Sequence, residues 1–171
     1  MPASYTVSLE KEQLIFSAAH FITFGDNICE RLHGHNYRVA CEVTGALNHQ
    51  AYVIDFIALR DALQKVVAEL DHHVLLPTQH PTIRVNPGER EVEARFEDRR
   101  WIFPAEDCRL LPLDNTTAER LAEYIANQIL PIVQAQTTNL VELSVSVDEN
   151  EGQWGRFRLV FREQNCRPAT G

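Results

Sequence analysis

The sequence has no long apolar run and no cluster of basic residues. No stretch approaches the roughly 18 consecutive apolar residues that a membrane-spanning helix needs. The amino-terminal Met1-Pro2-Ala3-Ser4-Tyr5 lacks the basic segment and apolar run of a secretory signal. The formal net charge is -8, and without a basic run the chain has little to neutralise phosphates. Membrane insertion and nucleic-acid binding are therefore not expected.

Cysteine is also scarce, and its spacing excludes a dense disulfide framework. The four cysteines are Cys29, Cys41, Cys108 and Cys166, and no two of them form a C-x-x-C pair. Free thiols suit a reducing, cytoplasmic setting. With 171 residues, 44% of them hydrophobic and 23% charged, the chain is expected to form one ordinary globular domain with a real core.

Three histidines stand out in this background. His33 and His35 are two residues apart, so on a strand they project from the same face. His20 ends an earlier apolar stretch, and antiparallel pairing of the two segments would bring the three imidazoles together. Three imidazoles and one open position form a catalytic zinc arrangement, although imidazole also binds copper, iron and nickel. A lone His-x-His commonly binds nothing, and it is the addition of His20 and Cys29 that favours a metal.

Alternating and helical patterns predict the elements around these histidines. They predict four strands, over 4–21, from His33 to Thr44, over 140–147 and over 155–161, with a bend in the first strand near 10–12. They also predict an inserted β-hairpin within 78–112. One helix should begin after Asp55, and a second should begin at a capping box of Thr116 and Glu119 and end near Pro131. Residues 163–171 are expected to form a flexible tail. This order predicts an α+β domain.

Two motifs make the chain resemble a known family. They are Phe16-Ser17-Ala18-Ala19-His20 and Cys29-x-x-x-His33-Gly34-His35-Asn36-Tyr37. Both resemble the 6-pyruvoyl-tetrahydropterin synthase family, which includes the 6-carboxy-tetrahydropterin synthases of queuosine biosynthesis. The spacing from Cys29 to the histidines resembles the 6-carboxy type more. The resemblance implies a T-fold: a four-stranded antiparallel sheet with two helices on one face. It also implies a homohexamer, a dimer of trimers, with active sites between subunits.

The same resemblance assigns roles to individual residues. His20, His33 and His35 would bind Zn²⁺, and Asp71 and His72 would assist Cys29 in proton transfer. Glu149 and Thr117 would bind the pterin, with Asp148 as the competitor if the register slips by one residue. From the residues alone, Asp71-His72 is more simply a solvated helix end, and Glu149 belongs to an acidic turn.

The activity that the resemblance implies is a lyase reaction on 7,8-dihydroneopterin triphosphate. The product would be 6-carboxy-5,6,7,8-tetrahydropterin, and the alternative product is 6-pyruvoyl-tetrahydropterin. A pterin aldolase that gives 6-hydroxymethyl-dihydropterin is a further alternative, because Glu30 places an acid beside Cys29. A non-catalytic metal-binding or pterin-binding module is the last alternative. A set of proton-transfer residues argues against it, since binding alone needs none.

Overall fold

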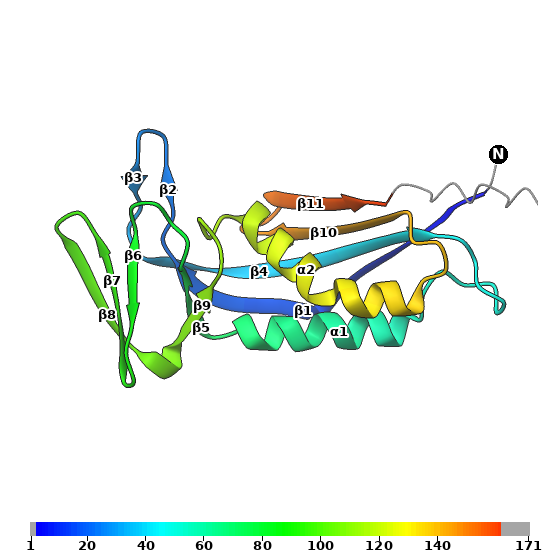
Figure 1. The fold of residues 1–171 in the computed structure, drawn as a ribbon, viewed down its shortest axis with the longest axis horizontal. Helices are drawn as coiled ribbons and strands as arrows, with labels where there is room; N and C mark the ends of the chain where they lie inside the picture. Colours follow the sequence, from blue (N-terminus) through cyan, green and yellow to red (C-terminus); the bar gives the residue numbers. More distant parts are fainter. Residues whose placement is uncertain (1–2, 162–171) are drawn as a thin grey trace, which may run out of the picture.

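A six-stranded sheet backed by two helices forms the larger part of the protein (Figure 1). The computed structural model describes residues 3–161. Along the sheet the strands are β11 (Trp154–Val160), β10 (Glu142–Asp148), β4 (His33–Gly45), β1 (Tyr5–His20), β5 (His73–Pro77) and β9 (Cys108–Leu111). The first four of these are antiparallel and correspond to the predicted strands. The predicted α+β class is therefore confirmed.

The prediction of a four-stranded sheet was wrong, because two short strands extend the β1 edge. β5 pairs with β1 in parallel through Ala18↔His73 and Ala19↔Val74, and β9 pairs with β5 in parallel. The sequence of β5 is a short apolar run directly after a helix, and such a run has no period that separates a strand from a buried loop. Only its position beside β1 makes it a strand.

The pairing of β1 with β4 sets the position of the histidines. His20 lies opposite His33, and Ala18 lies opposite His35. The register shifts between Glu10 and Ile15, which confirms the predicted bend in the long strand. Gly34 lies where a Cβ would be 3.1 Å from the Ala18 carbonyl oxygen, so the two backbones approach closely at this position.

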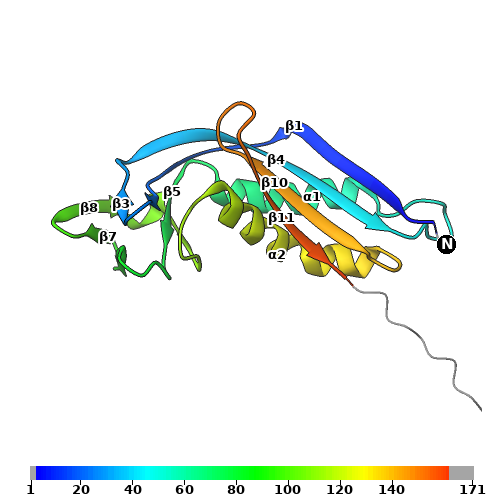
Figure 2. The ribbon, with the colours of Figure 1, turned by 90° about the horizontal axis from the view of Figure 1, so that it is seen from above.

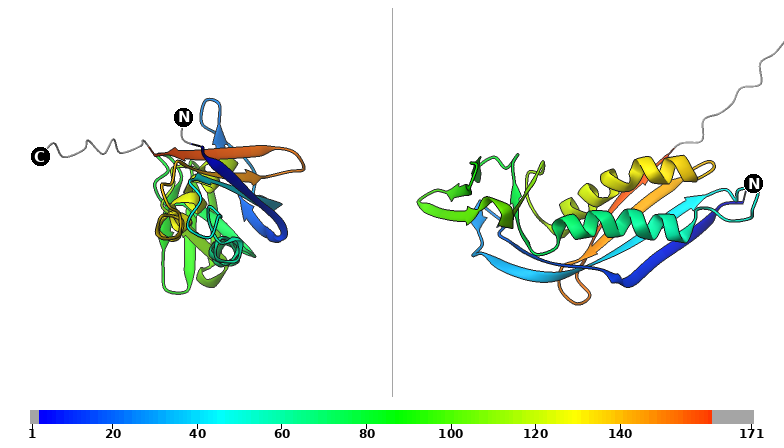
Figure 3. Two further views of the ribbon diagram at one scale, coloured as in Figure 1. Left: turned by 90° about the vertical axis from the view of Figure 1, so that its right-hand side faces the viewer. Right: turned by 90° about the horizontal axis from the view of Figure 1, so that it is seen from below.

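Two helices cover one face of this sheet (Figures 2 and 3). Helix α1 (Phe56–Leu70) begins as predicted, with the Asp55 Oδ1 accepting a 2.7 Å hydrogen bond from the Ile57 amide. Its buried face, which includes Leu59, Leu63 and Leu70, packs into the main core. Each fully buried leucine of this kind stabilises the fold by roughly 1.5–3 kcal/mol.

Helix α2 (Ala118–Gln136) differs from the prediction at both ends. Its N-cap is Thr117 without a side-chain bond, so the capping box of Thr116 and Glu119 was wrong. Pro131 lies inside the helix. Ile129 and Val133 on either side of the proline are both fully buried, so tertiary packing stabilises the turn that a proline would otherwise weaken.

The inserted segment forms a separate small sheet at one end of the molecule (Figure 1). Strands β6 (Arg84–Pro87), β7 (Glu91–Phe96) and β8 (Arg99–Pro104) are antiparallel, so the predicted hairpin has a third strand. A short 3₁₀ turn, η1 (Ala105–Asp107), leads to β9 in the main sheet. Beside the insertion stands a two-stranded hairpin, β2 (Thr23–Phe24) and β3 (Ile28–Cys29).

A second hydrophobic cluster joins the insertion to the main sheet. Its buried members are Phe21, Cys29, Leu76, Ile83, Val92, Ala94 and Phe96. Within the described residues, Cys29, Cys41 and Cys108 are free. Cys166 and the predicted tail over 163–171 lie outside the described residues. No helix in residues 3–161 is long and apolar enough to cross a membrane.

Candidate active site

The three predicted histidines meet where β1 ends and β4 begins. Their ring centroids are 4.7 Å apart for His20 and His33, 5.3 Å for His20 and His35, and 4.8 Å for His33 and His35. One ligand atom from each histidine and one Glu149 carboxylate oxygen all lie within 4.8 Å of one another. The sequence placed the imidazoles correctly, and the fold adds a carboxylate to them.

Backbone carbonyls orient two of these imidazoles. The His20 Nδ1 lies 2.9 Å from the Thr116 carbonyl oxygen, and the His33 Nδ1 lies 2.8 Å from the Arg31 carbonyl oxygen. A carbonyl oxygen can only accept a hydrogen bond, so each Nδ1 carries the proton. The Nε2 atoms of His20 and His33 therefore present lone pairs, as metal-ligating imidazoles do.

Glu149 faces the Nε2 atoms of His20 and His35. Its Oε1 lies 3.3 Å from the His20 Nε2 and 3.2 Å from the His35 Nε2, and both nitrogens are buried without a hydrogen-bond partner. The His20 Nε2 carries a lone pair, which repels the carboxylate oxygen at this distance unless a cation or proton lies between them. Burial also lowers the pKa of His35, which favours the neutral ring that a metal requires. Four nitrogen and oxygen donors within this radius can hold a metal ion such as zinc.

Asp148 has a structural position. It is buried, and its Oδ1 accepts a 2.9 Å hydrogen bond from the Gln153 amide while its Oδ2 accepts a 3.3 Å bond from the Gly152 amide. These bonds close the turn between β10 and β11. Glu149 is therefore the acid that reaches the histidines, while both Asp148 oxygens bind backbone amides of the turn.

Cys29 lies on β3, outside the histidine cluster. Its thiol is buried, and the one hydrogen-bond acceptor close to Sγ is the Glu30 carbonyl oxygen at 3.4 Å. Burial raises the pKa of the Cys29 thiol, and the nearby positive charge of Arg99 opposes that rise. The neighbouring Glu30 carboxylate lies 3.7 Å from the His33 Nε2. Two groups able to exchange protons thus lie on the loop that leads into the histidines.

Asp71 and His72 form a pair at the end of α1. The Asp71 Oδ2 lies 2.8 Å from the His72 Nδ1, and its Oδ1 accepts a 2.8 Å bond from the Ser17 amide. The Ser17 amide is the main reason that the pKa of Asp71 lies below its usual value. The His72 side chain is 81% exposed, and no contact joins the pair to Cys29 within the described part of one chain. Thr117 is the N-cap of α2, one residue after Thr116, and its side chain makes no capping hydrogen bond.

The structure adds residues that the sequence did not identify. The Thr116 and Arg31 carbonyls orient the imidazoles, and the Tyr37 hydroxyl lies 3.2 Å from the His20 Nδ1. Backbone carbonyls leave no residue pattern, so sequence reasoning could not find the first two. Tyr37 was detectable only as the next same-face residue after His33 and His35.

Comparison with known proteins decides the family. The family model described as 6-pyruvoyl tetrahydropterin synthase matches residues 9–159. The chain belongs to this family. It is therefore a lyase-type enzyme, and the resemblance recognised in the motifs is confirmed.

Individual members of the 6-pyruvoyl tetrahydropterin synthase family agree in sequence and in fold. A Methanocaldococcus jannaschii protein provisionally named a 6-carboxy-5,6,7,8-tetrahydropterin synthase is 33% identical over 85% of this chain and 90% of that protein. The Plasmodium falciparum 6-pyruvoyl tetrahydropterin synthase structure has a TM-score of 0.85 and 30% identity, and covers 94% of this chain and all of that chain. A Plasmodium vivax 6-pyruvoyltetrahydropterin synthase, with a glutamate described as a catalytic residue replaced by cysteine, has a TM-score of 0.85, 28% identity and the same coverage.

Proposed function

We propose that this enzyme is a zinc-dependent lyase that converts 7,8-dihydroneopterin triphosphate to 6-carboxy-5,6,7,8-tetrahydropterin, a step towards queuosine and other 7-deazapurines. The observation that carries the proposal is the convergence of one ligand atom from each of His20, His33 and His35, with the tautomers of His20 and His33 set by backbone carbonyls. Bound zinc supplies a Lewis acid that lowers the pKa of hydroxyl groups on the substrate side chain. The product follows the name of the archaeal relative.

The chain's own residues would supply proton transfer and pterin binding. Cys29 would take a proton from the substrate side chain, and the Asp71–His72 pair would give and take protons in the same reaction. Glu149 has two candidate roles. It can complete the metal site, as its 3.2–3.3 Å distances to the imidazoles allow, or turn to accept two N–H bonds from the pterin ring, as a carboxylate does well. Thr117 would bind the same substrate from the start of α2.

The isolated chain separates Cys29 from Asp71 and His72, which supports an active site between subunits. The His72 ring is 81% exposed while its Asp71 partner is anchored by Ser17, as suits a pair that meets another copy of the chain. β11 ends the sheet with one unpaired edge, and closure with a neighbour would cover it. We infer a trimer of this kind, stacked into a hexamer, in the cytoplasm, where the thiols of Cys29, Cys41 and Cys108 would stay reduced.

Glu30 supports a second candidate function, the pterin aldolase. Its carboxylate lies 3.7 Å from the His33 Nε2, so this acid reaches the metal site, whereas the Cys29 thiol lies outside the cluster. The glutamate described as catalytic in the Plasmodium vivax enzyme shows that a relative uses this type of residue. If the substrate side chain keeps all its carbons, the product of the lyase reaction would instead be 6-pyruvoyl-tetrahydropterin.

Product analysis tests these alternatives. The purified enzyme with zinc is incubated with 7,8-dihydroneopterin triphosphate, and the pterin products are identified by mass spectrometry. We expect 6-carboxy-tetrahydropterin from the parent and none from Cys29→Ala, which should keep its zinc because Cys29 lies outside the cluster. A main product of 6-hydroxymethyl-dihydropterin that disappears in Glu30→Gln would overturn the proposal in favour of the aldolase.

A mixing experiment tests the intersubunit site. Cys29→Ala and His72→Ala subunits are each inactive in this scheme. If they are unfolded and refolded together, random assembly should restore about a quarter of the sites, since a neighbour contributes the missing group. Activity that does not return in mixed oligomers of normal size would place both residues in one subunit.

A further inference from the structure

We propose that Arg99, on the inserted sheet, is the positioning residue that holds the Cys29 loop for proton transfer. Its Nη2 donates a 2.6 Å hydrogen bond to the Cys29 carbonyl oxygen, and its Nη1 donates a 3.1 Å bond to the Glu30 carbonyl oxygen. One guanidinium thus binds two successive carbonyls of the loop. The inference rests on the proposed catalytic role of Cys29.

The loop needs such support because its own structure is minimal. The β2–β3 hairpin has two residue pairs, Thr23↔Cys29 and Phe24↔Ile28. One further backbone bond, from the Glu30 amide to the Ile22 carbonyl oxygen at 2.9 Å, closes it. A hairpin this short has little stability in water. Asn115 and His80 hold the β2 side of this hairpin through Thr23, and the two bonds from Arg99 hold its β3 side at Cys29 and Glu30.

Arg99 is itself held in place by aromatic rings of the insertion. Its guanidinium carbon lies 5.3 Å from the Phe96 ring centroid and 5.5 Å from that of Trp101. Trp101 stacks on Phe21 with centroids 4.5 Å apart, and Phe21 directly follows the ligand His20. The insertion therefore contacts both the end of the metal-binding strand and the cysteine loop.

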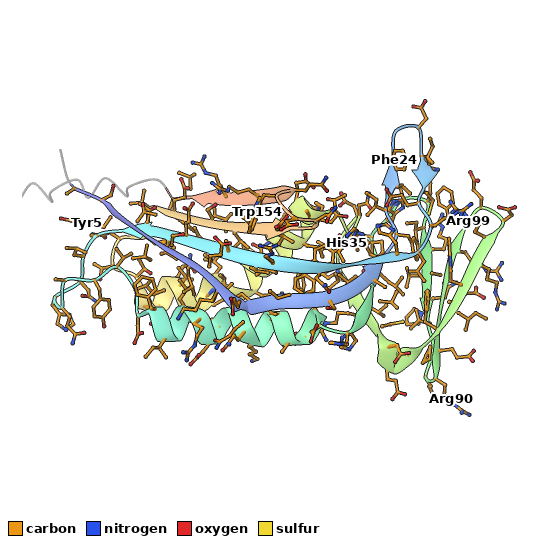
Figure 4. The ribbon with its side chains drawn as sticks, turned by 180° about the vertical axis from the view of Figure 1, so that it is seen from behind. Tyr5, Phe24, His35, Arg90, Arg99 and Trp154 are labelled. Atoms are coloured by element: carbon orange, nitrogen blue, oxygen red, sulfur yellow. The ribbon has the colours of Figure 1, made fainter. Side chains whose placement is uncertain are left out.

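The next arginine on the same strand provides a natural comparison. Arg100 points the other way on β8 and pairs with Glu93 at 2.5 Å, and no hydrogen bond joins it to the hairpin. Figure 4 shows Arg99 at the end of the insertion near the hairpin that carries Phe24, and Arg90 at the opposite end. The contact with the hairpin is therefore made by Arg99 and is not shared by its neighbour Arg100.

The guanidinium supplies both geometry and charge to Cys29. A fork of planar donors matches two adjacent carbonyls, which a lysine ammonium cannot reproduce in the same way. The positive charge also opposes the effect of burial on the thiol. Arg99→Lys keeps the charge and loses the fork, and Arg99→Met loses both, so the two contributions can be separated.

The test compares Arg99→Met, Arg99→Lys and the control Arg100→Gln with the parent enzyme. Alkylation by iodoacetamide is followed as a function of pH, and the modified Cys29 peptide is quantified by mass spectrometry to exclude the other cysteines. Turnover and zinc content are measured on the same samples. Because a small misplacement of a reacting group can cost about a hundredfold in rate, we expect kcat to fall about 10- to 100-fold in both Arg99 variants with zinc retained. Arg100→Gln should match the parent.

The pH profile separates positioning from general destabilisation. We expect the alkylation profile of Cys29 to move to higher pH in Arg99→Met and to stay near the parent in Arg99→Lys, a pattern that loss of fold stability alone would not give. Unchanged kcat and an unchanged profile in Arg99→Met would overturn the proposal. If Arg99→Met does not fold, a parental kcat in Arg99→Lys would overturn it instead. Full turnover in Cys29→Ala would show that the proposed catalytic role of Cys29 is wrong, while the alkylation profiles would still report on the contact with Arg99.

Discussion

Removal of one imidazole should abolish a metal-dependent increase in thermal stability. The Glu149 carboxylate lies 3.3 Å from the His20 Nε2, whose lone pair repels it, and bound zinc would relieve that repulsion. Zinc at 100 times its dissociation constant stabilises the native state by about 2.7 kcal/mol. For a chain of 171 residues this corresponds to a Tm increase of roughly 5–10 °C.

His35→Ala is the variant that tests this expectation. The variant removes a ligand, and comparison of each protein with and without zinc separates this loss from any change in the metal-free Tm that follows from the largely buried position of His35. Melting curves by circular dichroism, with zinc and with a chelator, should differ in the parent and coincide in His35→Ala. The exposed His49, outside the cluster, supplies the matched control, and His49→Ala should keep the zinc effect. A parent enzyme that melts at one temperature with and without zinc, and contains no metal, would refute the assignment.

Three further results are expected. Glu149→Gln should weaken pterin binding by about 30- to 1000-fold if this carboxylate binds the ring. If Glu149 is a metal ligand, the affinity for zinc should fall instead. Isothermal titration with the pterin and with zinc distinguishes these two roles. Unchanged affinity for both would exclude Glu149 from the site. Burial lowers the pKa of His80, so the folded protein binds a proton at this ring less readily than the unfolded chain does. The free energy of unfolding therefore falls as the pH decreases from the unfolded pKa of His80 towards its folded pKa. The urea midpoint should therefore decrease between about pH 7.5 and about pH 5.5, and less steeply in His80→Asn; equal slopes would contradict this. Gly155→Ala should destabilise the fold by about 1–3 kcal/mol, because its Cβ would lie 2.5 Å from the Glu119 amide nitrogen; an unchanged urea midpoint would show that α2 moves freely from β11.

Local patterns predicted most of the scaffold. The alternating segments gave the four antiparallel strands, and Asp55 marked the start of α1. The predictions failed where a tertiary contact overrides a local preference. The sequence around Pro131 carries a helix-ending residue, yet the buried Ile129 and Val133 continue the helix through it. β5 is likewise a strand only because β1 offers it an edge.

The sequence by itself determined that the three imidazoles lie close together. A spacing of two residues on a strand and antiparallel pairing are enough to bring His20, His33 and His35 together, because side-chain direction in a sheet follows from residue parity. The tertiary structure alone decided what surrounds them. The Thr116 carbonyl and Glu149 reach His20 from positions about 96 and 129 residues along the chain, and Arg99 reaches Cys29 across 70 residues. Such contacts depend on how separate elements pack, and a backbone carbonyl carries no residue identity that a sequence pattern could show.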